Sequence, residues 1–164
     1  MSAPFRIEVL ASQHDRHGFF CGNGALDRYF IERVTQDMRR RVAACYVALE
    51  NETNRIAGFY TLSAADIPLT DIPKTMAKRL PRYPSIPVAR LGRLAVDKNF
   101  QGRRMGGSLI WDALMRAARS EIAVFAMVVD AKNEDAVNFY RHHGFVTFGS
   151  LPNQMILPLS QILK

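Results

Sequence analysis

The stretch LGRLAVDKNFQGRRMGGSLIWDALMRAARS, residues 91–120, decides the fold. Its first six residues form a short apolar run with one arginine, which is typical of a buried strand. Residues 97–107 form a cationic loop that contains three glycines. From Ser108 onward, apolar residues recur at helical spacing and predict a helix with one apolar stripe. The stretch therefore predicts a strand, a glycine-bearing loop and a helix in succession.

This succession is suited to binding an anion. Glycines let the backbone approach a ligand closely, and the N–H groups of a first helical turn have no acceptor within the helix. Arg103 and Arg104 add full positive charges to the partial charge of the helix end. A diphosphate fits such a loop. Nucleotide hydrolysis is not expected, because no Gly-Lys-Ser/Thr sequence closes the loop.

Two segments resemble the GNAT acetyltransferase superfamily. Residues 101–106, QGRRMG, are similar to its acyl-CoA loop, Q/R-x-x-G-x-G/A, and residues 133–145, NEDAVNFYRHHGF, are similar to its downstream segment N-x-x-A-x-x-F-Y-x-x-x-G-F. The resemblance implies a GNAT-like acyl-CoA N-acyltransferase fold, in which a mixed α/β domain has a mostly antiparallel twisted sheet with helices on both faces. It also implies acetyl-CoA as the acetyl donor.

The resemblance also implies a set of site residues. Tyr140 stands where the family has the tyrosine that protonates the departing thiolate. The pantetheine arm is expected to pair with the edge of the 91–96 strand, whose N–H groups near its end would polarise the thioester carbonyl. The expected coenzyme-binding residues are Leu94, Ala95, Val96, Gln101, Gly102, Arg103, Arg104, Met105, Gly106, Gly107, Ser108, Asn133 and Phe139. Arg104 departs from the pattern, since the family usually has a glycine there, and its backbone angles are therefore in question.

A narrower resemblance covers nearly the whole chain. Residues 21–29, 58–63 (GFYTLS) and 91–97 (LGRLAVD) are similar to the acetyltransferase toxins of bacterial toxin–antitoxin modules. In that family the implied reaction is acetylation of the amino acid carried on charged tRNA, which blocks translation. The implied partner is a small DNA-binding ribbon-helix-helix antitoxin.

Length, charge and cysteine usage limit the class of protein. A chain of 164 residues is expected to form one domain, residues 1–164, with a proper core. The net charge of +7 favours a polyanionic partner such as nucleic acid. Cys21 and Cys45 lack metal or disulfide spacing, which indicates a reducing compartment. No signal peptide or membrane span is apparent, so we expect a cytoplasmic protein with no membrane partner.

The remaining elements follow from periodicity and turn residues. Asn23 is expected to cap a helix that continues to Met38, and Asn133 a second helix that ends before Gly144. Residues 64–87, which contain five prolines, predict a long irregular connection with a short helical segment at 75–80. Strands are predicted at 5–10, 43–49, 55–63, 123–130, 145–148 and 154–159. The predicted order is β-α-β-β-loop-β-α-β-α-β-β.

The sequence shows no general base. The 91–96 strand contains Arg93 rather than a glutamate, and Asp97 follows at its end. A lysine side chain, with a pKa of about 10.4, needs help to become a nucleophile, whereas an α-amino group, with a pKa of about 7.7–8.0, already has a free-base fraction. A site without a base therefore favours an α-amine, and a basic chain favours one attached to a polyanion. Charged tRNA meets both conditions, as does the N-terminus of an acidic protein.

Several basic residues are candidates for tRNA contacts, although each also suits a solvated surface or a basic helix end. They are Arg39, Arg40, Arg41, Lys78, Arg79, Arg90 and Arg93. No metal is expected, since neither the adjacent His142 and His143 nor His14 and His17 have the spacing of a ligand set. Trp111 lies just outside the apolar stripe of its helix, which leaves a homodimer contact open. Acetylation of a peptide terminus or a small amine stays an alternative function. So does a non-catalytic binding module, for which Arg104 is the one indication.

Overall fold

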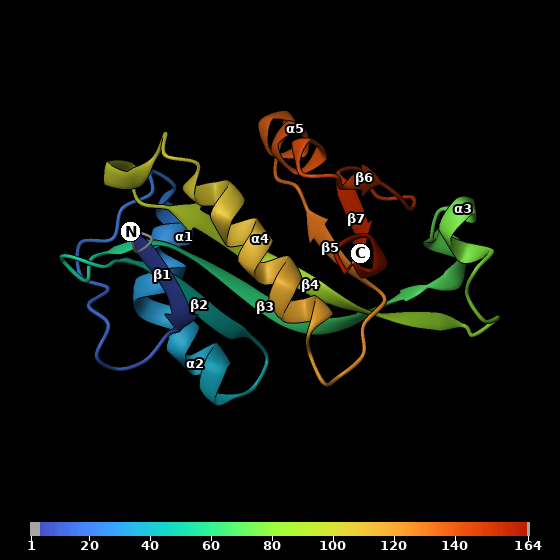
Figure 1. Cartoon of the computed structure of the whole chain (residues 1–164), viewed down its shortest axis with the longest axis horizontal. Helices are drawn as coiled ribbons and strands as arrows, with labels where there is room; N and C mark the ends of the chain where they lie inside the picture. The colour runs from blue at the N-terminus through green and yellow to red at the C-terminus, as the bar shows by residue number, and fades with distance from the viewer. Residues whose placement is uncertain (1–3, 164) are drawn as a thin grey trace. The chain divides into compact units, whose positions relative to one another are not determined.

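The computed structural model describes residues 4–163 of the chain. Its elements are β1 (Phe5–Val9), α1 (Gly24–Arg28), η1 (Tyr29–Arg33), α2 (Val34–Arg39), β2 (Ala44–Glu50), β3 (Ile56–Pro68), η2 (Leu69–Asp71), α3 (Lys74–Ala77), β4 (Ser85–Val96), η3 (Lys98–Phe100), α4 (Met105–Ala118), β5 (Ala126–Asp130), α5 (Glu134–His142), β6 (Val146–Thr147), β7 (Gln154–Pro158) and η4 (Leu159–Gln161). The strands form a seven-stranded mixed sheet in the order β1-β2-β3-β4-β5-β7-β6 (Figure 1). The predicted order of elements is confirmed.

Contacts divide the chain into two compact units. The first comprises residues up to 63 together with 92–113, and the second comprises 64–91 together with the chain from 114 onward. Strands β3 and β4 and helix α4 each contribute to both units.

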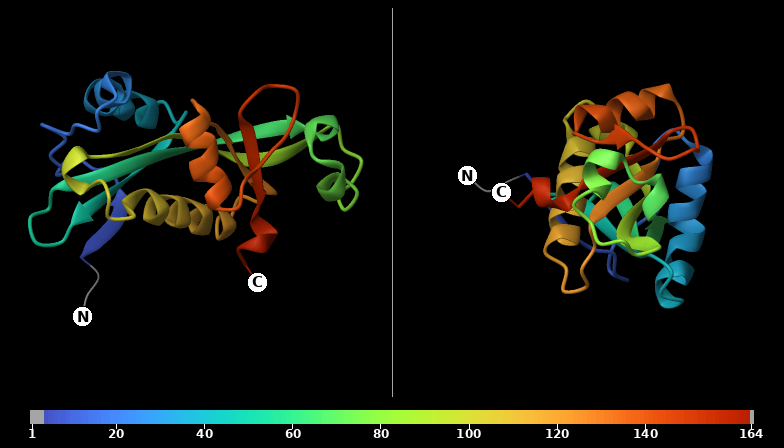
Figure 2. Two further views of the ribbon diagram at one scale, coloured as in Figure 1. Left: turned by 90° about the horizontal axis from the view of Figure 1, so that it is seen from above. Right: turned by 90° about the vertical axis from the view of Figure 1, so that its right-hand side faces the viewer.

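The first unit is a three-layer arrangement around β1, β2 and β3. β1 pairs antiparallel with β2, and β2 pairs antiparallel with β3, so the predicted hairpin is confirmed. Figure 2 shows the α1–α2 segment on one face of these strands and α4 on the other. On the α1–α2 face, the rings of Phe30 and Phe59 stack with centroids 4.2 Å apart, and Phe19 meets both rings edge-on. Both stacked rings are fully buried, which makes them the centre of this core.

The helical segment after Asn23 contains a π-turn. The Asn23 side chain accepts hydrogen bonds from the first N–H groups of α1, so the predicted cap is confirmed. Further on, the N–H of Val34 bonds to the carbonyl of Tyr29, five residues earlier. Arg16 donates to the carbonyls of Phe30 (2.6 Å) and Ile31 (3.2 Å). In this π-turn, Arg16 therefore supplies hydrogen bonds to carbonyls that would be bonded within a regular helix.

The end of α2 is a Schellman motif that has an arginine at the glycine position. The N–H of Val42 bonds to the carbonyl of Asp37, and the N–H of Arg41 to that of Met38. Arg41 has φ +60°, the left-handed conformation that favours glycine. The basic end of this helix thus carries local backbone strain.

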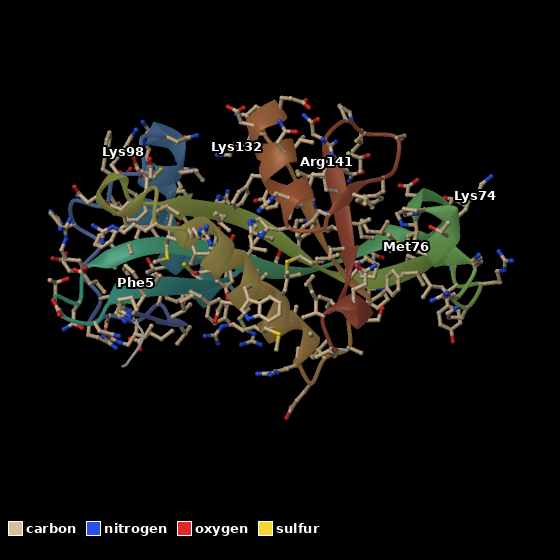
Figure 3. The ribbon with its side chains drawn as sticks, turned by 45° about the horizontal axis from the view of Figure 1, so that its top comes forward. Phe5, Lys74, Met76, Lys98, Lys132 and Arg141 are labelled. Carbon is tan, nitrogen blue, oxygen red and sulfur yellow. The ribbon has the colours of Figure 1, made fainter. Side chains whose placement is uncertain are left out.

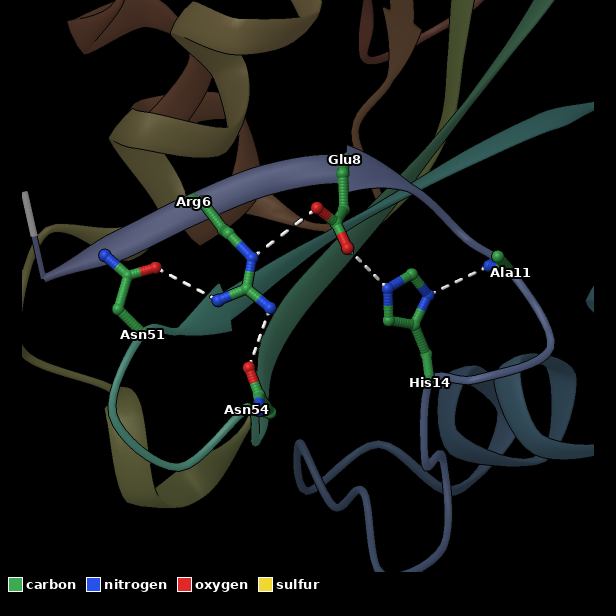
Figure 4. A network of polar contacts seen from close by, with 6 residues as sticks. All are labelled: Arg6, Glu8, Ala11, His14, Asn51 and Asn54. Carbon is green, nitrogen blue, oxygen red and sulfur yellow. Dashed lines mark hydrogen bonds and ion pairs between the residues drawn. The ribbon is translucent and has the colours of Figure 1, made fainter.

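A polar network fixes the outer surface of β1 (Figure 4). Arg6 donates to Asn51 and Asn54 in the β2–β3 turn, and it forms an ion pair with Glu8. Glu8 also meets His14 Nε2 at 2.7 Å, while His14 Nδ1 accepts from the N–H of Ala11. Because Nδ1 acts as an acceptor, the ring is the neutral tautomer that donates from Nε2. The hydrogen bond from His14 and the charge of Arg6 lower the pKa of Glu8.

The second unit has its own sheet segment and core. β4 pairs parallel with β5, β5 pairs antiparallel with β7, and β7 pairs antiparallel with β6. The core is aliphatic apart from one phenylalanine and consists of Ile67, Ile72, Ile86, Val88, Ala126, Val128, Phe148 and Ile156. Met76 of α3 packs against this core, whereas Lys74 on the same helix is exposed (Figure 3).

The predicted irregular connection at 64–87 is only partly right. β3 continues to Pro68 and β4 starts at Ser85, so both strands occupy residues that the prolines appeared to exclude. Ile67 and Ile86 lie on the core side of these strand segments, and each is followed by an exposed proline. The sequence did not predict these strand segments, because each is short and has a proline and polar residues around a single core-facing isoleucine. The short helix is confirmed as α3, although it begins one residue earlier and ends at Ala77.

Two other boundaries differ from the prediction by three residues, and several strand ends differ by one residue. α4 begins at Met105, three residues before the predicted start, and β5 begins at Ala126, three residues after it. The cap at Asn133 and the end of α5 before Gly144, which has φ +99°, are as predicted. No helix of residues 4–163 is long and apolar enough to span a membrane.

We expect the substitution Arg41→Gly to raise the free energy of unfolding by about 0.5–2 kcal/mol, because glycine adopts the left-handed conformation without the cost that a Cβ imposes. The measurement is urea denaturation followed by circular dichroism. Arg41→Ala removes the same charge but keeps the Cβ, so it serves as the control and should give no such gain. Equal stability of the two variants would contradict the strain at this helix end.

Candidate active site

The loop between β4 and α4 is anchored by Asp97, which is 3% exposed. Its carboxylate accepts from the N–H of Asn99 at 2.9 Å, which caps η3, and from the N–H of Phe20 at 3.0 Å. The backbone carbonyl of Phe20 accepts in turn from the N–H of Lys98. Asp97 therefore ties the end of β4 to the loop before α1, and its oxygens are already engaged in structural hydrogen bonds.

Gln101 closes the loop from the other side. Its Nε2 donates to the carbonyl of Val96 at 2.9 Å and to that of Cys21 at 3.1 Å. Lys98, labelled in Figure 3, runs beside Gly22, where a Cβ would lie 2.6 Å from Lys98 Cε. These bonds hold the loop in shape, and coenzyme binding by Gln101 stays a prediction.

Two residues in left-handed conformation shape the turn into α4. Gly102 has φ +82° and Arg104 has φ +61°. The question that Arg104 raised is answered, since this arginine adopts the conformation for which the family pattern has a glycine. The first α-helical bond of α4 runs from the N–H of Ser108 to the carbonyl of Arg104. By helix geometry, the N–H groups of Met105, Gly106 and Gly107 have no acceptor within the helix.

The charges at this turn suit an anion. Arg103 and Arg104 are exposed, and neither forms an ion pair with any residue from 4 to 163. The guanidinium of Arg103 lies over the buried ring of Phe100, with Cζ 5.4 Å from the centroid. Free N–H groups, a glycine turn and two unpaired arginines are the donor set that a diphosphate requires.

The strand that leads into this loop has a free edge. β4 pairs with β5 only from Val88 to Leu91, and among the described residues no strand pairs with its last five residues on that side. Leu94 and Val96 are half-buried, whereas Ala95 belongs to the core of the first unit. An extended ligand can add to this edge through backbone hydrogen bonds. Ala95 has only its backbone available for such a contact.

Tyr140 lies on α5 in the second unit. Its ring meets Phe139 and Phe145 edge-on at 5.3 and 5.5 Å, and burial raises the pKa of its hydroxyl to about 12. Within residues 4–163 this hydroxyl makes no hydrogen bond, so a ligand atom can receive its proton. Asn133, predicted as a coenzyme contact, uses its side chain to cap α5. Phe139 packs against Tyr140 and His143.

The predicted tRNA contacts have different surroundings. Arg39, Arg40 and Arg41 are exposed at the end of α2, and Lys78 and Arg79 are exposed just after α3. Arg90 donates to Asp130 at 2.8 Å, so its charge is partly neutralised. Arg93 is exposed and lies on the ring of Tyr29, with Cζ 3.6 Å from the centroid.

Two features of the site were missed from the sequence. Tyr29 falls within the helix predicted to continue to Met38, but the sequence does not indicate that its ring supports Arg93 or that its hydroxyl donates to Asp37 at 2.7 Å. The link between Phe20 and Asp97 joins residues 77 positions apart, and no local spacing indicates such a pair. Among the described residues, no group of three or more His, Cys, Asp or Glu could hold a metal ion.

Comparison with known proteins gives a consistent result. Residues 10–145 match the acetyltransferase (GNAT) family. The chain is 32% identical over 158 residues to a tRNA-acetylating toxin of Mycobacterium tuberculosis, covering 95% of this chain and 91% of that protein. It is 29% identical over 166 residues to a protein of Sinorhizobium fredii named "Probable toxin TacT", covering 95% and 92% of the two chains.

Solved structures show the same fold. AtaT complexed with acetyl-methionyl-tRNAfMet superimposes with a TM-score of 0.89 at 28% identity, covering 97% of each chain. A tyrosine-to-phenylalanine variant of AtaT, bound to the C-terminus of the antitoxin AtaR and acetyl-CoA, gives a TM-score of 0.81 at 25% identity and covers 98% of this chain and 96% of that one. The GNAT-like fold that the sequence predicted is therefore confirmed.

We expect Arg104→Gly to be about 1–2 kcal/mol more stable than Arg104→Ala, because only glycine relieves the left-handed strain at this position. Both variants lose the same charge, so both should bind coenzyme A more weakly than the native chain, and by similar factors. Denaturant unfolding gives the stabilities and titration calorimetry the affinities. Two variants of equal stability would show that the positive φ carries no cost here.

Proposed function

Because the chain belongs to the acetyltransferase (GNAT) family, we propose that it transfers the acetyl group of acetyl-CoA to the α-amino group of aminoacyl-tRNA and so blocks translation. The observation that carries the proposal is the similarity, along 95% of the chain, to a protein named as a tRNA-acetylating toxin. The net charge of +7 supports a polyanionic substrate. The family match runs through both compact units, and we infer that residues 1–164 act as one acetyltransferase domain.

The loop from Gln101 to Ser108 supplies the coenzyme site. Its first-turn N–H groups and Arg104 bind the diphosphate, and the free edge of β4 from Leu94 to Val96 receives the pantetheine arm. A backbone N–H of this edge polarises the thioester carbonyl. Bound acetyl-CoA supplies an acetyl group activated as a thioester.

Tyr140 donates its hydroxyl proton to the departing sulfur. With a pKa of about 12, this phenol stays protonated at neutral pH. It is a weaker acid than a thiol, whose pKa is about 8.5, so giving up its proton outright would be unfavourable. The nitrogen that becomes an amide must shed one proton, and the sulfur must gain one. Tyr140 therefore works best as a relay. It receives the proton that the nitrogen sheds as it delivers its own hydroxyl proton to the sulfur.

An α-amine is the acceptor that this site can use. Asp97 has the one carboxylate of the β4–α4 loop. This carboxylate already accepts hydrogen bonds from the N–H groups of Phe20 and Asn99. An α-amino group has a free-base fraction on the order of a tenth at neutral pH without any base, whereas a lysine side chain has almost none. Exposed arginines at the end of α2 and the lysine and arginine after α3 offer contacts to the tRNA phosphates.

The protein also has partners beyond its substrate. One structural neighbour, AtaT, is bound to the C-terminus of an antitoxin. We infer a ribbon-helix-helix antitoxin for this chain, and action in the cytoplasm, where charged tRNA is found. Trp111, 57% exposed on α4, is the residue that we assign to a homodimer contact.

A direct test is incubation of the protein with total charged tRNA and labelled acetyl-CoA, followed by mass spectrometry of the aminoacyl species. We expect acetylation of the α-amine of at least one of them. The rate should fall steeply with salt, since each phosphate contact releases counterions and adds about 0.7–0.9 to the slope of log K against log[salt]. Replacing Arg39, Arg40 and Arg41 with Gln should flatten this slope. Arg119, an exposed arginine after α4, provides the control, and Arg119→Gln should leave the slope unchanged.

Three outcomes would contradict the proposal in different ways. Transfer to a peptide N-terminus or a small amine, but to no charged tRNA, would assign the alternative substrates. Binding of acetyl-CoA without transfer to any amine would leave a non-catalytic module. Absence of coenzyme binding would show that the loop from Gln101 to Ser108 is not a coenzyme site.

We expect Tyr140→Phe to keep affinity for acetyl-CoA while lowering kcat by about 10²–10⁴-fold, the range for loss of a proton donor. The variant retains the ring contacts with Phe139 and Phe145, so its stability should change little. Single-turnover kinetics separates binding from transfer. Tyr83→Phe, which removes the hydroxyl of an exposed tyrosine, is the matched control. An unchanged kcat in Tyr140→Phe would exclude this residue from the mechanism.

A further inference from the structure

Arg93 is held in a fixed position on β4. Its guanidinium lies 3.6 Å from the ring centroid of Tyr29, a distance at which the cation and the aromatic face attract each other. Tyr29 is 7% exposed, and its hydroxyl donates to Asp37 Oδ2 at 2.7 Å. The arginine itself is exposed. A positive charge is therefore presented to solvent on a buried and immobilised support.

The support is built by the π-turn of η1. The carbonyl of Tyr29 accepts from the N–H of Val34, and Arg16 holds the next two carbonyls, those of Phe30 and Ile31. Phe30 is fully buried in the core of the first unit. Tyr29 thus has little freedom to move, and the guanidinium that rests on it is preorganised.

The backbone of β4 places Arg93 beside the edge assigned to the thioester. Its N–H donates to Thr61 Oγ1 at 3.0 Å, and a Cβ on Gly92 would lie 2.9 Å from the same oxygen. Consecutive Cα atoms are about 3.8 Å apart, so Arg93 directly precedes the Leu94–Val96 edge. Its side chain leaves the strand on the same face as that of Ala95, which packs with Phe30 and Phe59.

No neighbouring group forms an ion pair with this charge within residues 4–163. The Asp37 carboxylate on α2 contacts the Tyr29 hydroxyl rather than the guanidinium. Burial raises the pKa of Tyr29, and burial also raises the pKa of the Cys45 thiol on β2 to about 12, so both groups are neutral at working pH. On β3, Thr61 does not titrate. Of these groups, Arg93 carries the exposed charge that lies next to the Leu94–Val96 edge.

We propose that Arg93, held on Tyr29, keeps the attacking α-amine in its free-base form and so takes the place of a general base. This inference rests on the proposed function. A like charge disfavours the protonated amine, whose extra proton passes to solvent before attack. The nitrogen lone pair then forms the bond to the acyl carbon, the carbon–sulfur bond breaks with its electron pair on sulfur, and the second proton of nitrogen replaces the one that Tyr140 delivers to sulfur.

The size of the effect follows from titration. An α-amine with a pKa of about 7.8 is roughly one-eighth free base at pH 7, and a decrease of one pKa unit makes it about three-fifths free base. Arg93 is therefore worth about a fivefold increase in reactive amine at pH 7. This advantage disappears above about pH 9, where the amine is free in any case.

The test is the pH dependence of kcat, measured at saturating acetyl-CoA and methionyl-RNA minihelix, for Arg93→Gln and the native protein, because kcat reports pKa values within the bound complex. We expect Arg93→Gln to be about fivefold slower at pH 7 and equal above about pH 9, with the ascending limb moved up by about one unit. Arg93→Lys keeps the charge and should keep the native profile. Arg55→Gln is the matched control, because Arg55 is also exposed and lies over a ring, that of Phe100, at 5.3 Å.

An unchanged pH profile of kcat, with KM for the minihelix raised at every pH, would overturn the proposal and assign Arg93 to an RNA phosphate. A second readout needs no turnover. A minihelix whose ¹⁵N-labelled methionyl group is attached through a stable amide is bound with free coenzyme A, and the ¹⁵N shift of its α-amine is titrated. A pKa lower with the native protein than with Arg93→Gln supports the inference, and equal values contradict it. Failure of the native protein to acetylate any charged tRNA is a separate result that rejects the proposed function.

Discussion

The buried carboxylate of Asp97 is the constraint on which the candidate coenzyme site depends. It joins the end of β4 to the loop before α1 by accepting from the N–H of Phe20, and it caps the short η3 turn through Asn99. Gln101 completes the closure by donating to carbonyls at both places. These hydrogen bonds restrict the conformation of the backbone from residue 102 to residue 107, which leads into α4. The first N–H groups of that helix therefore point to a fixed place.

The turn itself stores strain where a ligand would bind. Arg104, the residue just before α4, adopts a positive φ that costs an L-residue about 1–2 kcal/mol. The same residue contributes a full charge beside the helix end. A glycine would relax the backbone but remove that charge, so the arginine exchanges some stability for a stronger attraction to a diphosphate.

Proton management in this protein contrasts with that of enzymes that use a carboxylate base. The one acidic side chain of the β4–α4 loop is committed to structure, and the phenol of Tyr140 has a pKa raised by burial to about 12. Such a phenol is protonated near neutral pH, so it can take up a proton only as it delivers its own. An acceptor whose own pKa lies near 8 suits this arrangement, whereas a lysine side chain does not.

The sequence by itself determined the order of the elements, the GNAT-like fold, the helix caps at Asn23 and Asn133, and the glycine loop between β4 and α4. These features depend on local periodicity, turn chemistry and short motifs, which can be read within a window of some ten residues. It also indicated that the backbone at Arg104 would be unusual. It did not locate the outer parts of β3 and β4, because short polar and proline-containing strands lack a clear alternation. Only the tertiary structure placed Arg93 on Tyr29 and Phe20 on Asp97, since both contacts join segments more than 60 residues apart and are selected by packing of the whole core.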